Sequence, residues 1–203
     1  MPTYVEVIPA SQGLLPSPCP DCLWWQSAQG CDASVVLQRR LDWMASLERT
    51  WGSVGLVAMD GRETVTAVQF APVRSLSRPH GLPVGPPPDD AVLIYCLRGR
   101  VGRPVREAQQ LLLQAMGHMR RRRVHEIYAY ARPLGSRHLC GVRNMFGMEF
   151  LESSGFQVVR IDGEMALMRV DLRGLLPALA EARTALRRVV AHGGHPSPAT
   201  YTR

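Results

Sequence analysis

The sequence predicts a mixed α/β domain with a sheet of about seven strands flanked by helices. Short apolar runs alternate with amphipathic stretches of helical period, Asp-Gly pairs separate strand-like runs, and 46% of the 203 residues are hydrophobic against 20% charged. A chain of this length buries one sizeable core. We therefore expect one domain over residues 1–172, a C-terminal amphipathic helix at 173–191 and a disordered tail at 192–203.

The first part of the chain predicts a strand, two helices and a hairpin. Residues 3–8 alternate as in a strand, and after a Gly/Pro/Ser-rich loop the stretch CLWWQ (22–26) predicts a short helix. Residues 34–51 have helical periodicity with arginines between the apolar positions, and 53–73 predicts two strands about Asp60-Gly61. The apolar face of the longer helix is expected to comprise Val36, Leu37, Leu41, Met44, Leu47 and Trp51.

The remainder follows the same α/β alternation after a proline-rich loop that cannot pair in a sheet. The expected elements are, in order, a strand at 91–99, a helix at 108–123, a strand at 125–132, a short helix at 144–156 stopped at Gly155, a hairpin at 156–172 about Asp162-Gly163, and a helix at 175–190.

The net charge and the hydrophobic content of the chain indicate which kinds of binding partner to expect. The formal net charge of +7 and the pI near 9.7 favour an anion, which could be nucleic acid, a phosphorylated cofactor or an acidic protein. Four arginines, 120–123, end a predicted helix, where cations complement the dipole, so a solvated helix end is favoured over a nucleic-acid site. No apolar run approaches the roughly 20 residues of a membrane span, and the N-terminus lacks signal-peptide features. We expect a cytoplasmic protein.

The pair Cys19-Pro-Asp-Cys22 is a lone CxxC motif. A structural zinc site needs four ligands, and only the scattered Cys31, His138 and Cys140 could complete one. Ordinary cysteines are the simpler interpretation, so no metal site is expected.

Two local motifs point to a family. Arg103-Pro-Val-Arg106-Glu-Ala108 lies between a strand and a helix, where backbone N–H groups and the helix dipole can hold phosphate, although Pro104 has no N–H and Arg106 adds bulk. The second motif comprises Asn144, Gly147, Phe150, Leu151, Glu152, Gly155 and Phe156.

These motifs resemble the GNAT N-acetyltransferase superfamily. Its pyrophosphate loop reads Gln/Arg-x-x-Gly-x-Gly/Ala, and its later stretch reads Asn-x-x-Ala-x-x-Leu-Tyr-Glu-x-x-Gly-Phe. Here Arg106 stands at the middle glycine, and Leu151 at the tyrosine that protonates the departing thiolate in many members. The stretches CPDCLWWQ and DAVLIY, with the C-terminal helix, also resemble a branch common in actinobacteria.

The resemblance implies a GNAT-like fold and an acyl-CoA-dependent N-acyltransferase, with acetyl-CoA as cosubstrate and direct attack by an unknown amine of a small molecule or protein. It implies that a backbone N–H near Tyr95, Cys96 and Leu97 polarises the thioester. The implied cofactor-binding residues are these three with Arg98, Arg103, Arg106, Ala108 and Asn144. Four guanidinium groups are expected beside the phosphate loop, those of Arg98, Arg100, Arg103 and Arg106.

Strand 125–132 supplies the candidates for proton transfer. We consider Glu126 with Tyr128, or His125 with Tyr130, and expect alternation to let only one pair face the cleft. Tyr128 or Tyr130 could replace the donor lost at Leu151.

Two alternatives stay open. One is a catalytically silent GNAT-fold module that binds a protein or another ligand, and the other is a basic nucleic-acid-associated protein using Arg120 to Arg123. The C-terminal helix could also pair two chains, or pack on its own sheet.

Overall fold

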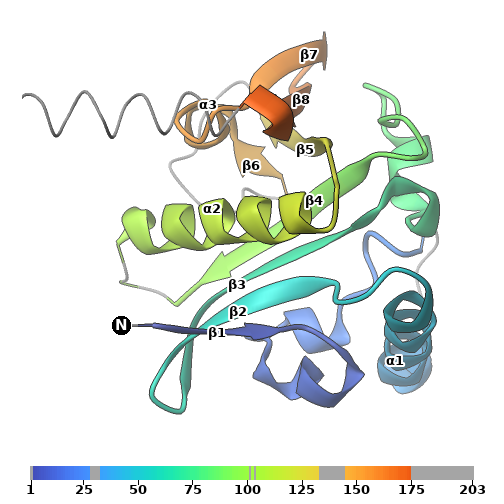
Figure 1. Cartoon of the computed structure of the whole chain (residues 1–203). Helices are drawn as coiled ribbons and strands as arrows, with labels where there is room; N and C mark the ends of the chain where they lie inside the picture. Colours follow the sequence, from blue (N-terminus) through green and yellow to red (C-terminus); the bar gives the residue numbers. More distant parts are fainter. Residues whose placement is uncertain (1, 28–32, 101, 103, 133–144, 175–203) are drawn as a thin grey trace, which may run out of the picture.

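The mixed α/β prediction is confirmed by a computed structural model, which describes residues 2–27, 33–100, 102, 104–132 and 145–174. One sheet runs in the order β1-β2-β3-β4-β5-β8-β7, and β6 pairs with β5 (Figure 1). Its strands are β1 (Thr3–Glu6), β2 (Gly55–Asp60), β3 (Glu63–Pro72), β4 (Val92–Gly99), β5 (Glu126–Arg132), β6 (Phe146–Gly147), β7 (Gln157–Asp162) and β8 (Met165–Asp171). The helices are α1 (Ala33–Thr50), α2 (Val105–Arg121) and α3 (Met148–Glu152), with 3-10 turns η1 (Pro9–Leu14), η2 (Cys19–Asp21), η3 (Val73–Ser75) and η4 (Arg78–Gly81).

Both expected Asp-Gly hairpins are confirmed. Asp60 pairs with Glu63 across Gly61, whose φ is +61°, and Asp162 pairs with Met165 across Gly163, whose φ is +56°. Glycine takes this left-handed conformation without a steric penalty, which is why the pair marks a tight turn.

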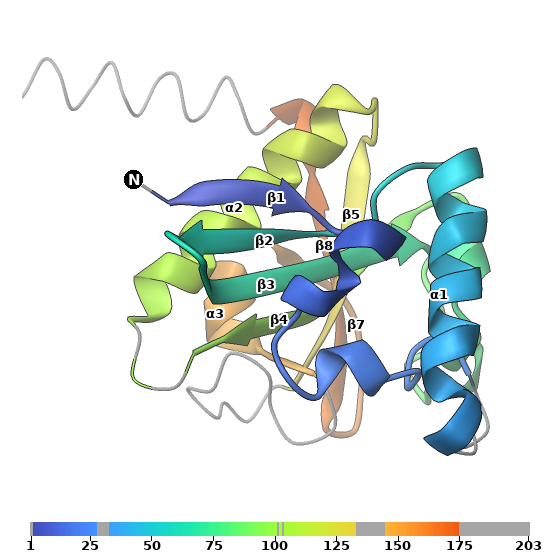
Figure 2. The same ribbon diagram turned by 90° about the horizontal axis from the view of Figure 1, so that it is seen from below.

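The sheet buries apolar side chains on both faces. One face packs against α2 and includes Phe70, Ile94 and Leu97, while the opposite face includes Leu93, Tyr95 and Tyr130. Figures 1 and 2 show α2 on one side of the strands and α1 with the N-terminal turns on the other. The alternation of side chains along each strand therefore decides which core a residue joins.

Several boundaries differ from the sequence-based expectation. The stretch 22–26 is not a helix, since the chain turns there after η2. Helix α2 begins at Val105, three positions before the expected start, because Pro104 supplies its N-cap residue with φ −61°. The segment expected as one helix at 144–156 contains β6 and α3, and its expected end is confirmed by Gly155, with φ +91°.

The predicted buried face of α1 is wrong at two positions. Leu37 is 46% exposed, whereas Arg40 is only 1% exposed. Arg40, Met44 and Leu47 follow the helical repeat and are buried together against the sheet.

Several predictions lie outside the described residues. These are the C-terminal helix and tail beyond residue 174, Arg103, Asn144, and the possible metal ligands Cys31, His138 and Cys140. Within the ranges that are described, no helix has the length and apolar character to span a membrane.

Candidate functional site

Strands β4 and β5 are parallel neighbours that pair only at their first residues. The register joins Val92 to Ile127 and Leu93 to Tyr128. Beyond these pairs β4 continues against β3 as far as Gly99, while β5 continues against β8 as far as Ala131. The two strands therefore separate from Ile94 onward and leave an opening in the middle of the sheet.

A bulge lies in β4 at the start of this opening. Gln69 pairs with Cys96 and Phe70 pairs with Ile94, so Tyr95 is an extra residue relative to β3. The bulge breaks the alternation, because Tyr95 and Cys96 both join the core opposite α2 while Leu97 joins the α2 side. The three residues expected to polarise a thioester thus lie together where β5 leaves β4.

Strand β6 borders the far end of the opening. Ala131 pairs with Phe146 of β6 and with Ala166 of β8, so β6 lies on the edge of β5 that faces β4. On that edge the segment between Tyr128 and Ala131 pairs with neither strand. Ala129 and Tyr130 therefore line the open part of β5.

The predicted phosphate loop is mostly the first turn of α2. Pro104 is the N-cap residue and makes no side-chain cap, so it leaves the N–H groups of the first turn unoccupied by its side chain. Glu107 N–H donates to the Pro104 carbonyl at 3.0 Å, and within the described part of the chain no acceptor is recorded for the N–H groups of Val105 and Arg106. Arg106 is exposed, whereas Ala108 is buried under the sheet. The residues present fit a phosphate group.

The arginines expected beside this turn do not all lie there. Arg98 lines a cavity with Tyr95 on the face opposite α2, because strand alternation turns it away from the helix. Arg100 forms an exposed ion pair with Glu63 of β3. Of the described arginines among these four, Arg106 is therefore the one that lies on the first turn of α2.

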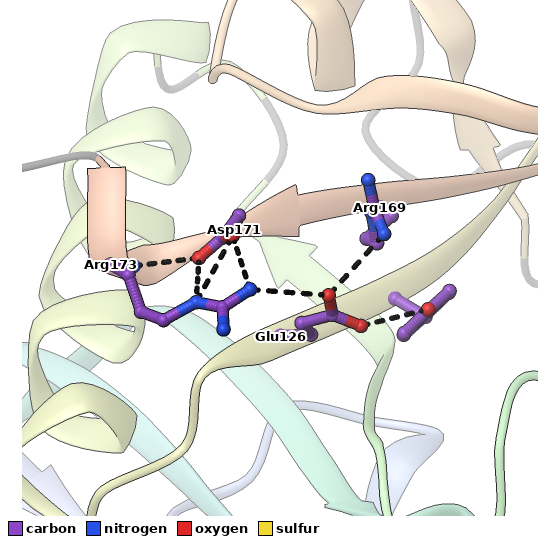
Figure 3. Close-up of polar contacts among 5 residues, drawn as sticks. Glu126, Arg169, Asp171 and Arg173 are labelled. Atoms are coloured by element: carbon purple, nitrogen blue, oxygen red, sulfur yellow. Dashed lines mark hydrogen bonds and ion pairs between the residues drawn. The ribbon is translucent and has the colours of Figure 1, made fainter.

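Glu126 lies at the closed end of the β4–β5 pair, in a charged cluster with β8 (Figure 3). Its carboxylate is 3.3 Å from Arg169 Nη1 and 3.8 Å from Arg173 Nη2. Arg173 also pairs with Asp171 at 2.7 Å, and its hydrogen bonds hold the pKa of Asp171 at about 2. Glu126 is thus fixed among cations.

Tyr128 and Tyr130 both face the core opposite α2. The Tyr128 hydroxyl donates to Glu126 at 3.0 Å, and burial together with this bond raises its pKa. The Tyr130 hydroxyl donates to the Gly85 carbonyl at 2.9 Å, its ring stacks on Trp25, and burial raises its pKa. The expected opposition of Glu126–Tyr128 to His125–Tyr130 is wrong, because positions 126, 128 and 130 share one side of a strand.

Leu151 is fully buried on α3, in the core beneath α2. Its side chain packs with apolar neighbours and supplies no proton. Any proton donor must therefore come from another element.

A buried polar group around Arg40 escaped the sequence analysis. Arg40 Nη2 donates to Gln69 on β3, the Tyr95 hydroxyl lies 3.5 Å from the same Gln69 oxygen, and Gln26 Nε2 lies 3.3 Å from that hydroxyl. The spacing of Arg40 from Met44 and Leu47, at i+4 and i+7, was the available signal.

The arginine run 120–123 is only partly a solvated surface. Arg122 lies 3.8 Å over the Trp51 ring and donates to the carbonyls of Ser53 and Trp51. Burial lowers its pKa. Arg120, Arg121 and Arg123 are exposed, so three of the four arginines are free of the packing that holds Arg122.

The CxxC motif has no metal-like arrangement among the described residues. No group of three or more His, Cys, Asp or Glu side chains is placed to hold a metal ion in that part of the chain. Cys19 Sγ instead lies 3.8 Å from Cys96 Sγ.

Comparison with solved structures identifies the fold. Similar structures include the PaiA N-acetyltransferase of Thermoplasma acidophilum in complex with coenzyme A, with 13% identity over 84% of this chain and 99% of that one and a TM-score of 0.54. The putative acetyltransferase YncA of Salmonella typhimurium, solved with acetyl-CoA, has 14% identity over 85% and 94% and a TM-score of 0.55. A putative GNAT-family acetyltransferase of Desulfovibrio desulfuricans has 13% identity over 85% and 99% and a TM-score of 0.50.

The chain therefore has the GNAT fold, as the sequence predicted. No protein-family model matches the sequence, and a search of curated proteins finds no match.

Proposed function

We propose that this protein is an acyl-CoA-dependent N-acyltransferase that transfers an acetyl group to an amine by direct attack in a ternary complex. The observation that carries the proposal is the separation of β4 from β5 at the Tyr95 bulge. An extended thioester arm can enter such an opening and meet backbone donors without disrupting the sheet. The similar structures PaiA and YncA, which hold coenzyme A and acetyl-CoA, support acetyl-CoA as the cosubstrate.

The first turn of α2 is the proposed site for the pyrophosphate. The N–H groups of Val105 and Arg106 and the positive end of the helix dipole favour an anion there. Arg106 can add a charge-assisted bond from the same turn. This arginine would offset the loss of the glycine that the superfamily has at its position.

The chemistry requires three acts from this chain. A backbone N–H of Tyr95, Cys96 or Leu97 would stabilise the negative charge that develops on the thioester oxygen as the neutral amine attacks its carbon. The carbon–sulfur bond then breaks, and the departing thiolate takes a proton while the amine gives one up. Acetyl-CoA supplies only the activated acyl group.

Strand β5 supplies the proposed proton-transfer residues, Glu126, Tyr128 and Tyr130. Tyr130 lies on the unpaired segment of β5, beside the opening that the thioester would enter, and is the proposed donor. Glu126 is the proposed base. It lies at the closed end of the strand pair, so it would act through Tyr128 or a water chain.

Titration calorimetry with acetyl-CoA, coenzyme A and 3′-dephospho-coenzyme A tests the cosubstrate. We expect micromolar binding of acetyl-CoA and at least about a tenfold loss in Arg106→Gln, since one bond to a charged group contributes about 1.5–3 kcal/mol. Arg100→Gln is the matched control and should change affinity by less than about twofold, because its guanidinium is paired with Glu63 at the surface. No heat at millimolar acetyl-CoA would overturn the proposal.

A second candidate is a GNAT-fold module that binds a ligand without turnover. The buried Leu151, at the position of the superfamily's tyrosine, favours it. Thiol release with a panel of amines separates the two candidates, because the silent module would bind acetyl-CoA or a partner and release no coenzyme A.

A further inference from the structure

Arg40 is a buried cation with no carboxylate partner among the described residues. Its side chain is 1% exposed. Nη1 donates to the Cys22 carbonyl at 2.7 Å, and Nη2 donates to the Gln69 side-chain oxygen. Nε is also buried and has no acceptor in the part of the chain that is described.

Within the described residues, no negative charge compensates the Arg40 guanidinium. An arginine side chain is a planar cation with five N–H donors and no acceptor. The oxygens of Cys22 and Gln69 are neutral dipoles and offset only part of the lost hydration. An apolar side chain could pack α1 on the sheet without that cost, so the charge calls for an explanation beyond packing.

A cavity of about 100 Å³ adjoins this charge, and we refer to it as the Arg40 cavity. A second guanidinium, that of Arg98, contributes to its lining, and no aspartate or glutamate does among the described residues. A lining with two guanidinium groups and no described acid favours an anionic occupant. The volume equals about three water molecules at ~30 Å³ each, which is enough for a carboxylate and a carbon or two.

The Arg40 cavity adjoins the opening of the sheet. Tyr95 and Cys96, at the bulge where β5 leaves β4, both line it. The Tyr95 hydroxyl makes a long hydrogen bond, 3.5 Å, to the side-chain oxygen of Gln69. Burial raises the pKa of this hydroxyl, so it keeps its proton and can donate to a stronger acceptor such as a carboxylate. A carboxylate held here would lie beside the residues proposed to meet the thioester.

We propose that the Arg40 cavity binds the carboxylate of the acyl acceptor, so that the substrate class is amines that carry a carboxylate, such as amino acids. The inference rests on the proposed function. Arg40 is the specificity-determining residue, because a bidentate guanidinium distinguishes a carboxylate from the amide of the same shape.

Saturation-transfer NMR with propionate and propionamide tests the site without requiring turnover. Propionate is small enough for a cavity of about 100 Å³ and has the shape of propionamide, from which it differs in its negative charge and in having no N–H donors. We expect wild-type protein to bind propionate at least tenfold more tightly, Arg40→Gln to reduce the ratio to near one, and Arg40→Lys to retain part of it. Arg49→Gln, an exposed arginine on the same helix, is the matched control and should keep the wild-type ratio. Equal binding of the two probes by wild-type protein would overturn the inference even if the Arg40 variants fail to fold.

Acetyl-CoA binding and acceptor preference separate this inference from the proposed function. With acetyl-CoA bound, β-alanine should be acetylated at least tenfold faster than β-alaninamide, and an equal rate would refute the substrate class alone. If propionate binds and acetyl-CoA does not, the anion site stands and its assignment to an acyl acceptor falls with the proposed function.

Discussion

Replacing Arg122 should destabilise the fold, whereas replacing its neighbours in the arginine run should not. The guanidinium lies 3.8 Å over Trp51 and donates to the carbonyls of Ser53 and Trp51. A cation–π contact contributes about 0.5–2 kcal/mol, and a hydrogen bond from a charged donor about 1.5–3 kcal/mol. Because Arg122 is half-buried and such contributions are not additive, we expect Arg122→Met to lower the free energy of unfolding by about 3 kcal/mol.

Thermal and urea denaturation measure this loss. For a chain of this size about 3 kcal/mol corresponds to a fall in Tm of roughly 6–12 °C. Arg120→Met is the control, since Arg120 is exposed on the same helix end, and it should change stability by no more than about 0.5 kcal/mol. If the two variants are equally stable, the structural role of Arg122 is refuted.

Three further outcomes follow from the structure. Arg123→Gly should raise the free energy of unfolding by about 1 kcal/mol in urea denaturation, because Arg123 ends α2 at φ +62°, where glycine is unstrained. Burial lowers the pKa of His118, so the unfolded state binds more protons below about pH 6.5; Tm should fall as pH drops through that range, and His118→Gln should flatten the fall while His80→Gln, an exposed control, does not. Tyr130→Phe should cost about 1–2 kcal/mol in denaturation, because the Gly85 carbonyl loses its donor, and unchanged stability would contradict the bond.

Local patterns predicted much of the fold. Asp60-Gly61 and Asp162-Gly163 each predicted a hairpin, because a tight turn with positive φ requires particular residue types at two adjacent positions. The stretch 144–156 was less transparent, since β6 exists only because Phe146 reaches the free edge of β5. Such a two-residue pairing depends on tertiary contact and has no period of its own.

The site was harder to predict than the fold. Motif spacing predicted Arg106 and the β4 residues as part of a cofactor site, and that assignment stays a prediction. The extent of β4–β5 pairing could not be predicted, because it depends on how far the two strands diverge and no residue type determines that divergence. Arg40 was missed because a cation on an amphipathic helix is expected at the surface. Its position on the same helix face as Met44 and Leu47 decides that it is buried, although its residue type favours the surface.

Hydrogen exchange with and without acetyl-CoA tests the central claim most directly, because it reports where the cosubstrate binds. The account predicts slower exchange of the amides of residues 94–98 and of the first turn of α2, with no change at Glu126 to Tyr128 on the closed end. Protection that is absent from β4 and α2, or confined to the closed end, would contradict it.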